Sequence, residues 1–329
     1  MLLQPRRAGN KYYNVLPTSV SPPSGYVRLL SRYLFEKAER EPRQPLGPFR
    51  ADAGALAAPV PPTSLHATWL GHSTVLLEVD GRRFLTDPVW SERASPSQLL
   101  GPKRFFAPPL PLAQVPPLDG ILLSHDHYDH LDEAAIRALA PRGEQFFCPL
   151  GVGAHLRRWG VAAGRITEVT WWDKIALARD FELIATPARH FSGRGLLNRD
   201  STLWASWVLK GPQHRVLFGG DSGPFDEAFE QIGAAYGPFD LVMLEIGASD
   251  PEWAAIHLGP DNALAAHRLL GGGPLLPLHW GTFNLAFHAW RQPVQRLIEA
   301  AGPEVTLLLP APGQRLEVAA GPLNSQWWK

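Results

Sequence analysis

The sequence of 329 residues predicts a layered α/β fold. Three observations indicate it. From His66 onward, short apolar runs rich in β-forming residues recur, stretches of helical periodicity separate them, and each run is closed by a polar and often ionisable residue. This alternation is typical of sheets covered by helices. The length is ample to bury a sizeable core, and one large domain is expected.

The first 64 residues are expected to form an N-terminal extension that packs on a main domain of residues 65–329. Proline and alanine are frequent in this extension, and only residues 26–40 have apolar residues at helical spacing. A helix packed on the main domain is the favoured interpretation of that pattern. The alternative is a helix that docks on a membrane or on a partner.

Apolar runs of the main domain are predicted as strands, and amphipathic stretches as helices. The strands are expected at residues 74–79, 83–86, 120–124, 182–186, 215–218, 241–244 and 275–278. The helices are expected at residues 133–139, 154–159, 225–232, 260–270 and 294–300. Residues 107–117 are expected to form a loop, because their prolines exclude a helix or a central strand.

Composition and charge exclude several classes of protein. Lys plus Arg and Asp plus Glu both total 31, so the chain has no net positive charge that would attract nucleic acid or an anionic membrane surface. The single cysteine, Cys148, excludes an intramolecular disulfide and a cysteine-based zinc site, and it is typical of a reducing compartment. No stretch approaches the ~20 apolar residues that span a bilayer. A soluble cytoplasmic protein without a nucleic-acid partner is therefore expected.

The strongest local signal is Ser124-His-Asp-His-Tyr-Asp-His-Leu-Asp132, which lies between a predicted strand and a predicted helix. In an extended exit from a strand, His125 and His127 project to the same side, while Asp129 and His130 fall in the following turn and can face a neighbouring centre. Imidazole and carboxylate are the ligands that zinc accepts without thiolate. The segment predicts a metal site with room for two ions, and a solvated polar loop is the alternative.

Other strand ends supply further candidate ligands. His190, Asp221 and His279 each follow an apolar run, and Asp87 closes another. Because open α/β sheets place their sites at the carboxyl ends of strands, these side chains are expected to converge on one cleft. Taken singly, each has a hydrogen-bonded core or surface role as its alternative. Asp87 is expected to orient a ligand histidine or fix its loop, and His72 to brace a tight loop near the site.

The order His-x-His-x-Asp-His, then His, Asp and His, resembles the metallo-β-lactamase superfamily. More narrowly, the sequence is similar over nearly its whole length to the family of N-acyl-phosphatidylethanolamine-hydrolysing phospholipases D. The motifs that carry this similarity are Lys11-Tyr-Tyr-Asn14, Trp69-Leu-Gly-His72-Ser-Thr, Leu85-Thr-Asp87-Pro, Ser95-Pro-Ser-Gln98, Gly101-Pro-Lys-Arg-Phe105, Phe218-Gly-Gly-Asp221-Ser-Gly223 and His279-Trp-Gly-Thr-Phe283.

The resemblance implies a four-layer αββα sandwich, a homodimer and a centre of two zinc ions with a bridging hydroxide as nucleophile. Zinc lowers the pKa of bound water from ~15.7 to about 7, so no side-chain nucleophile is needed. Iron or manganese would accept the same ligands. The implied ligands are His125, His127 and His190 for one ion, Asp129, His130 and His279 for the other, and Asp221 as the bridge.

The implied activity is hydrolysis of a phosphodiester, and the resembled enzymes cut a phospholipid on its amine-alcohol side. One rival interpretation is a lactonase or other ester hydrolase with the same metals, and another is a non-catalytic binding protein whose metals only hold loops. Residues 249–257 are shorter and more acidic than the family's stretch, which disfavours a bulky anionic lipid. A small-molecule or lipid-derived phosphodiester is therefore expected as substrate, and peripheral membrane contact stays open.

Catalytic and substrate-binding roles are assigned to a few further side chains. Asp129 is assigned to catalysis as a metal ligand. His257 is assigned a substrate contact or a general-acid role, since the resembled family has a histidine near the substrate, and structural use is the alternative. Trp253, Trp280 and Phe283 are candidates for lining an apolar cleft, with core packing as the alternative.

Overall fold

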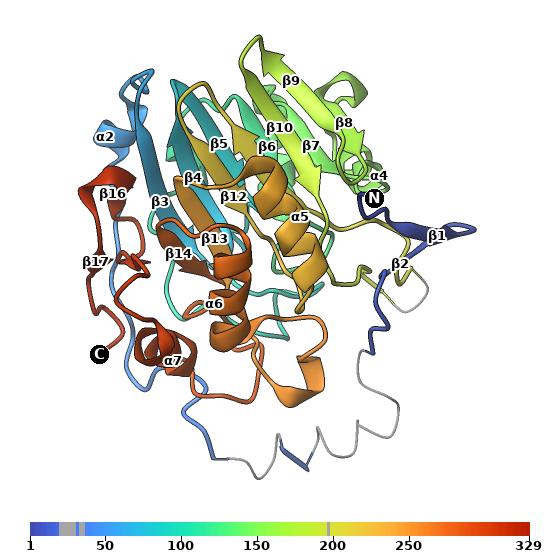
Figure 1. The fold of residues 1–329 in the computed structure, drawn as a ribbon. Coiled ribbons are helices and arrows are strands. Elements are labelled where there is room, and N and C mark those ends of the chain that lie inside the picture. The colour runs from blue at the N-terminus through green and yellow to red at the C-terminus, as the bar shows by residue number, and fades with distance from the viewer. Residues whose placement is uncertain (20–30, 33–36, 196–197) are drawn as a thin grey trace.

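The computed structural model of the chain describes residues 1–19, 31–32, 37–195 and 198–329. Two β-sheets lie face to face, and helices cover the outer face of each sheet (Figure 1). This arrangement is the four-layer αββα sandwich that was expected from the sequence.

The first sheet has, within the described residues, seven strands in the order β16-β3-β4-β5-β6-β7-β8. Strands β3 (Leu65–Gly71), β4 (Thr74–Val79) and β5 (Arg82–Thr86) form an antiparallel meander. The next strands run parallel to β5, and they are β6 (Gly120–Leu122), β7 (Phe146–Pro149) and β8 (Ile166–Val169). From the C-terminal end of the chain, β16 (Arg315–Glu317) closes the other edge against β3.

The second sheet repeats this plan with strands in the order β14-β13-β12-β11-β10-β9. Its antiparallel part comprises β9 (Lys174–Ala178), β10 (Phe181–Thr186), β11 (Ser206–Lys210) and β12 (Arg215–Phe218). The parallel part continues from β12 to β13 (Leu241–Glu245) and β14 (Leu275–Leu278). In both sheets, parallel strands therefore point their carboxyl ends toward the same edge of the sandwich.

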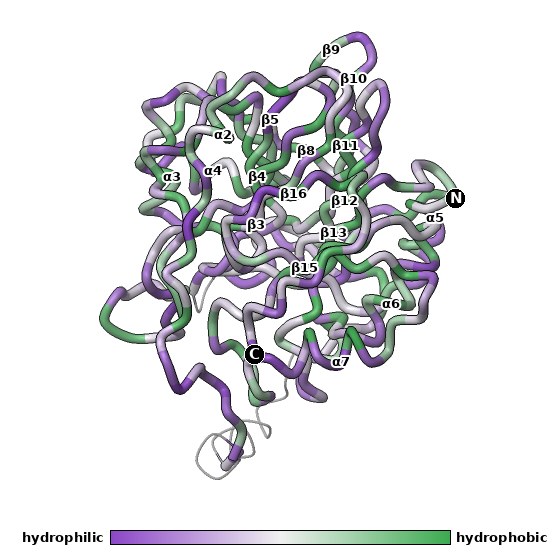
Figure 2. Tube along the Cα trace, turned by 90° about the vertical axis from the view of Figure 1, so that its left-hand side faces the viewer, coloured by the Kyte–Doolittle hydropathy of each residue, from purple (hydrophilic) through white to green (hydrophobic). Residues whose placement is uncertain are grey.

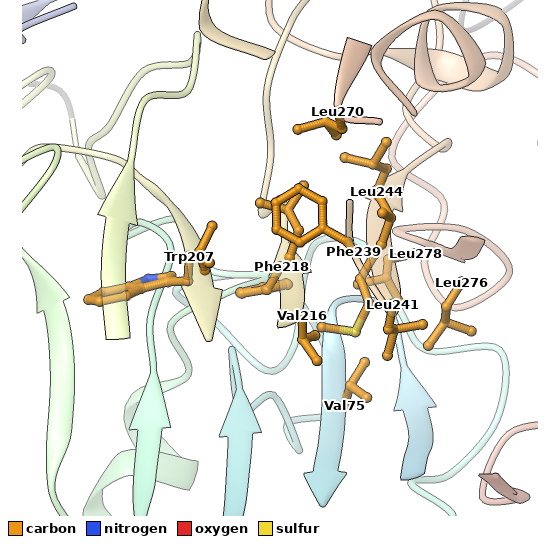
Figure 3. Close-up of a cluster of buried hydrophobic side chains, with 14 of the residues drawn as sticks. Val75, Trp207, Val216, Phe218, Phe239, Leu241, Leu244, Leu270, Leu276 and Leu278 are labelled. Carbon is orange, nitrogen blue, oxygen red and sulfur yellow. The ribbon is translucent and has the colours of Figure 1, made fainter. Parts of the chain in front are cut away.

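Successive side chains of a strand point to opposite faces of the sheet, so the core consists of two clusters, one on each face. On β4, Val75 and Leu77 face the cluster between the sheets, whereas Leu76 faces the cluster under the outer helices. Figure 3 shows part of the larger cluster, in which Val75 of the first sheet lies toward Val216 and Leu241 of the second. Full burial of each such side chain contributes about 1.5–3 kcal/mol to folding.

Helices α3 (Glu133–Leu139) and α4 (Gly153–Arg158) cover the first sheet. Helices α5 (Asp226–Tyr236), α6 (Gly259–Leu269) and α7 (Gln292–Ala300) cover the second (Figure 1). Helix α7 alternates hydrophobic and hydrophilic segments along its turns (Figure 2). Its buried face carries Val294 and Leu297. The short α2 (Ala53–Ala57) adds Leu56 to the cluster under the first sheet.

Helix α3 begins directly after the histidine-rich motif because Asp132 caps it. The Asp132 carboxylate accepts a hydrogen bond from Ala134 N at 2.9 Å, which satisfies one of the free amides at the helix start. The same carboxylate accepts hydrogen bonds from the backbone amides of Trp90 and Ser91. The cap therefore also ties the motif to the loop that follows β5.

Seven strands and five helices were expected in the main domain, and each has a counterpart in the structure. Strands β4, β12 and β14 and helix α3 occupy the predicted residues, and the other bounds shift by a few residues. Strand β6 ends earlier than predicted because Ser124 N donates to the Asp87 carboxylate instead of to a neighbouring strand. Strands β3, β7, β8, β9, β11 and β16 were not predicted, and neither were the short β15 (Leu308–Leu309) and β17 (Leu323–Asn324).

The N-terminal hairpin of β1 (Arg6–Ala8) and β2 (Lys11–Tyr13) lies beside the second sheet (Figure 1). Leu3 N donates to Gln231 Oε1 on α5 at 3.0 Å. The helix expected at residues 26–40 falls mostly outside the described residues. None of the helices in the described part of the chain has the length and apolar character needed to cross a membrane.

Candidate metal centre

Side chains with metal-binding chemistry gather where strands of both sheets end. The first sheet supplies the motif that follows β6, and the second supplies residues after β10, β12 and β14. The structure brings together all seven predicted ligands, which are His125, His127, Asp129, His130, His190, Asp221 and His279.

Three histidines form the first group. His127 Nδ1 lies 2.9 Å from His125 Nε2 and 3.3 Å from His190 Nε2. Four ligands at about 2.0–2.1 Å from a tetrahedral zinc ion lie roughly 3.3–3.4 Å from one another, which follows from the geometry of the tetrahedron. The spacing of these nitrogens therefore fits a single ion.

Asp129, His130 and His279 form the second group. Asp129 Oδ2 lies 3.3 Å from His279 Nε2 and 3.6 Å from His130 Nε2. These separations are again those of ligands that share one metal ion. Among the described residues, His130 Nε2 and both ring nitrogens of His279 are buried without a hydrogen-bond partner. Since buried polar atoms are nearly always paired, these nitrogens indicate a ligand position.

Asp221 lies between the two groups. Its Oδ2 atom is 3.1 Å from His130 Nε2 and 3.2 Å from His279 Nε2. The same oxygen is 3.9 Å from His125 Nε2 and 3.8 Å from His190 Nε2. One carboxylate thus faces both groups, as a bridging ligand must.

Neighbouring acceptors fix which imidazole nitrogen faces the centre. His190 Nδ1 lies 2.9 Å from the carbonyl oxygen of Ile256, and His130 Nδ1 lies 2.7 Å from Asp87 Oδ2. Because a carbonyl oxygen can only accept, His190 Nδ1 carries the hydrogen and Nε2 keeps its lone pair. An Asp87 oxygen faces His130 Nδ1 in the same way, so in the neutral rings both Nε2 atoms face the centre.

The electrostatics of the two groups differ. Burial lowers the pKa of His125 and of His190 well below the usual value, which leaves neutral imidazoles. Burial would raise the pKa of Asp221, yet His130 and His279 hold it well below its usual value. Conversely, burial would lower the pKa of His279, but Asp221 and Asp129 raise it to about 10. The second group therefore contains ionised carboxylates whose negative charge a divalent cation would neutralise.

Asp87 and Ser124 brace the motif from the first sheet. Asp87 is fully buried, and its carboxylate accepts hydrogen bonds from Ser124 N at 2.7 Å and from Ser124 Oγ at 2.5 Å. It also contacts His130 as described above. The backbone of Asp87 has φ 29°, an uncommon value for a residue other than glycine. Its predicted position beside a ligand histidine thus agrees with the observed contacts.

His72 contacts the centre through a carboxylate. Its Nε2 lies 3.0 Å from Asp129 Oδ2, and burial lowers its pKa to about 3, so a neutral ring donates this hydrogen bond. The carbonyl oxygen of His72 accepts from His279 N at 3.1 Å. Both His72 and His279 have positive φ, at 53° and 63°. His72 therefore links two ligands of the second group, and its nitrogen also lies within ligand distance of that group.

His257 lies at the rim of the centre, where Glu245 holds it. His257 Nδ1 is 2.5 Å from Glu245 Oε2, while Glu245 Oε1 accepts from Ser222 N at 2.8 Å. The His257 side chain is 12% exposed, and its Nδ1 lies 3.9 Å from Asp221 Oδ2. Neither Glu245 nor Ser124 was predicted to act in the site. Glu245 could have been found, because it closes an apolar run as Asp87 does.

The three aromatic candidates for substrate contact have different surroundings. Trp280 is 3% exposed and stacks on Trp69 and Trp327, with ring centroids 5.5 and 5.2 Å apart. This corresponds to the core-packing alternative. Phe283 places its ring against His72 at 5.2 Å, and the half-buried Trp253 stacks on Phe287 at 5.6 Å.

The role of Asp87 can be tested by the substitution Asp87→Asn. The amide keeps the size of the side chain but replaces one of the two carboxylate oxygens that accept from Ser124 and His130, so the affinity for added zinc should fall about 10- to 100-fold. Competition with a chromophoric chelator measures this affinity. The exposed Asp226→Asn on α5 is the control that should leave it unchanged. Equal affinities of the Asp87→Asn variant and the wild type would contradict the proposed orientation of His130.

Comparison with known proteins relates the chain to metal-dependent hydrolases. A family model described as a beta-lactamase superfamily domain matches residues 82–280. An uncharacterized protein of Mycobacterium tuberculosis is 49% identical over 296 residues, which cover 85% of this chain and 78% of that protein. N-acyl-phosphatidylethanolamine-hydrolyzing phospholipase D 1 of Caenorhabditis elegans is 39% identical over 233 residues. That match covers 68% of this chain and 65% of the worm protein.

Solved structures share the fold. A metallo hydrolase from the archaeon Ignicoccus hospitalis superposes with a TM-score of 0.57 at 22% identity, over 77% of this chain and 98% of that one. The predicted similarity to the metallo-β-lactamase superfamily and to the phospholipases D is confirmed. The chain belongs to the beta-lactamase superfamily and is a metal-dependent hydrolase.

Proposed function

We propose that this hydrolase binds two zinc ions and cleaves a phosphodiester, as a phospholipase D-like enzyme of small-molecule or lipid-derived substrates. The observation that carries the proposal is the pair of ligand groups that share Asp221. The nitrogen and oxygen donors suit zinc, and they would also accept iron or manganese. The relative from Caenorhabditis elegans, named for hydrolysis of a phospholipid, supports the choice of substrate.

When bound, a pair of divalent ions lowers the pKa of water and stabilises negative charge that develops on the substrate. The residues of the chain position and balance this chemistry. Asp129 and Asp221 supply the negative charge, and His125, His127 and His190 supply neutral nitrogens. Because the centre does not select the electrophile, the substrate must be selected by the residues around it.

His257 is our candidate for the group that delivers a proton to the leaving oxygen. Its Nδ1 faces the Glu245 carboxylate, so Nε2 is the atom left to hold or release a proton. Glu245 is itself held by Ser222 N and Leu258 N, which fixes the direction of the pair.

The acidic stretch that precedes His257 is partly neutralised in the fold. Arg32 donates two hydrogen bonds to the carboxylate of Asp250, at 2.7 and 2.8 Å. This two-point ion pair offsets the negative charge of Asp250, which is 3% exposed in its side chain. The acidity of residues 249–257 is therefore a weaker argument against a phospholipid than the sequence alone indicates.

A substrate panel tests the proposed reaction. The zinc-loaded protein should hydrolyse bis(p-nitrophenyl) phosphate and an N-acyl-phosphatidylethanolamine, and removal of zinc by a chelator should abolish both activities. An N-acyl homoserine lactone serves as the competing substrate. Hydrolysis of the lactone alone would identify a lactonase, and bound zinc without turnover of any substrate would identify a binding protein. Either result would refute the proposal.

The role of His257 can be tested by His257→Gln. Loss of the proton donor should lower kcat about 100-fold or more while zinc content stays at the wild-type level. His214→Gln is a matched control, because His214 pairs with Asp80 at 2.6 Å in the turn between β11 and β12, away from the centre. An unchanged kcat in His257→Gln would mean that His257 is structural, and lost zinc would mean that it is a ligand.

A further inference from the structure

We propose that Asn14 is a positioning residue for His190, so that the N-terminal segment completes the metal centre. The inference rests on the proposed metal-binding function. The family model begins at residue 82, and Asn14 therefore lies outside the matched domain. The sequence placed Asn14 in a motif similar to the phospholipases D and predicted that the extension packs on the main domain, but it assigned Asn14 no role.

One side chain satisfies both backbone groups of His190. Asn14 Nδ2 donates to the carbonyl oxygen of His190 at 2.6 Å, and His190 N donates to Asn14 Oδ1 at 3.1 Å. His190 lies in the connection between β10 and β11, and it is fully buried. Backbone groups that are buried outside a sheet must find other partners. The Asn14 amide supplies them as a neighbouring strand would.

The Asn14 side chain holds the backbone of His190, and a second contact holds its imidazole ring. His190 Nδ1 donates to the Ile256 carbonyl oxygen, so the ring direction and the backbone position are held independently. Together they place Nε2 at 3.3 Å from His127 Nδ1. The next residue, Phe191, packs its ring against His127 with centroids 4.4 Å apart. A shift of the backbone at His190 would therefore disturb two ligands of the first group.

Asn14 is itself held from both sides along the chain. Before it, Tyr12 N donates to the carbonyl oxygen of Asp200 at 2.8 Å. After it, the Arg189 guanidinium donates to Thr18 Oγ1 at 2.9 Å and to the carbonyl oxygen of Pro17 at 2.6 Å. These contacts fasten residues 12–18 to the loop that carries His190. The amide of Asn14 is thus held by contacts within the chain itself, as a positioning group must be.

Two substitutions in the full-length protein separate positioning from general packing. Asn14→Ala removes both hydrogen bonds to His190. Asn14→Asp keeps the size and the acceptor for His190 N but replaces the donor with an oxygen that repels the carbonyl group. Both variants should bind zinc about 10-fold or more weakly than the wild type in a chelator competition. Their cobalt(II) forms should also show an altered visible absorption spectrum, since that spectrum reports on ligand geometry.

Gln231→Ala is the matched control, because Gln231 fastens the same N-terminal segment through Leu3 N without contacting a metal ligand. This variant should keep wild-type zinc affinity, although it also loses a contact that fastens the N-terminal segment. Equal loss of affinity in Gln231→Ala, or wild-type affinity in Asn14→Asp, would overturn the proposal. Failure of the wild type to bind zinc would instead refute the proposed function, and a lack of phosphodiesterase activity would leave this test intact.

Discussion

Two carboxylates, the buried Asp221 and the partly buried Asp129, set the main electrostatic constraint of this structure. An ionised carboxylate that is removed from water loses several kcal/mol of solvation unless opposite charge compensates it. Histidines surround both groups, and His130 and His279 have raised pKa values because of these carboxylates. The positive charge that the site requires can come from those protons or from divalent ions. The nitrogens of His125 and His190, which burial keeps neutral, favour metal ions.

The two sheets of the sandwich each supply part of the ligand set, which brings these charged side chains together at one edge. The motif after β6 belongs to the first sheet, and His190, Asp221 and His279 belong to the second. Trp207 links the layers beside the centre, because its Nε1 donates to the carbonyl oxygen of Leu123 at 2.9 Å. Gly220 allows the close approach of Asp221. It has φ 59°, and a Cβ atom there would lie 2.6 Å from Cβ of Ser124.

Sequence patterns predicted the parts of this arrangement that depend on local periodicity. Apolar runs closed by ionisable residues gave β4, β12 and β14 and indicated that Asp87, Asp221 and His279 lie at strand ends. The missed strands have weaker signals. The edge strand β9 has half-buried or exposed residues throughout, and β11 mixes Ser206 and Lys210 with its apolar residues. The convergence of the strand ends was predicted, but individual side-chain contacts between segments were not. The pairing of His257 with Glu245 and the contact of Asn14 with His190, 176 positions away, depend on the tertiary fold.

In the proposed centre, both sheets and the N-terminal segment contribute residues, and two metal ions share Asp221. Anomalous diffraction from crystals of the zinc-loaded protein, recorded on both sides of the zinc absorption edge, tests this most directly. The expected result is two anomalous peaks that both contact Asp221. One peak should lie among His125, His127 and His190, and the other among Asp129, His130 and His279. A single peak that does not contact Asp221, or zinc bound only elsewhere on the chain, would contradict the account.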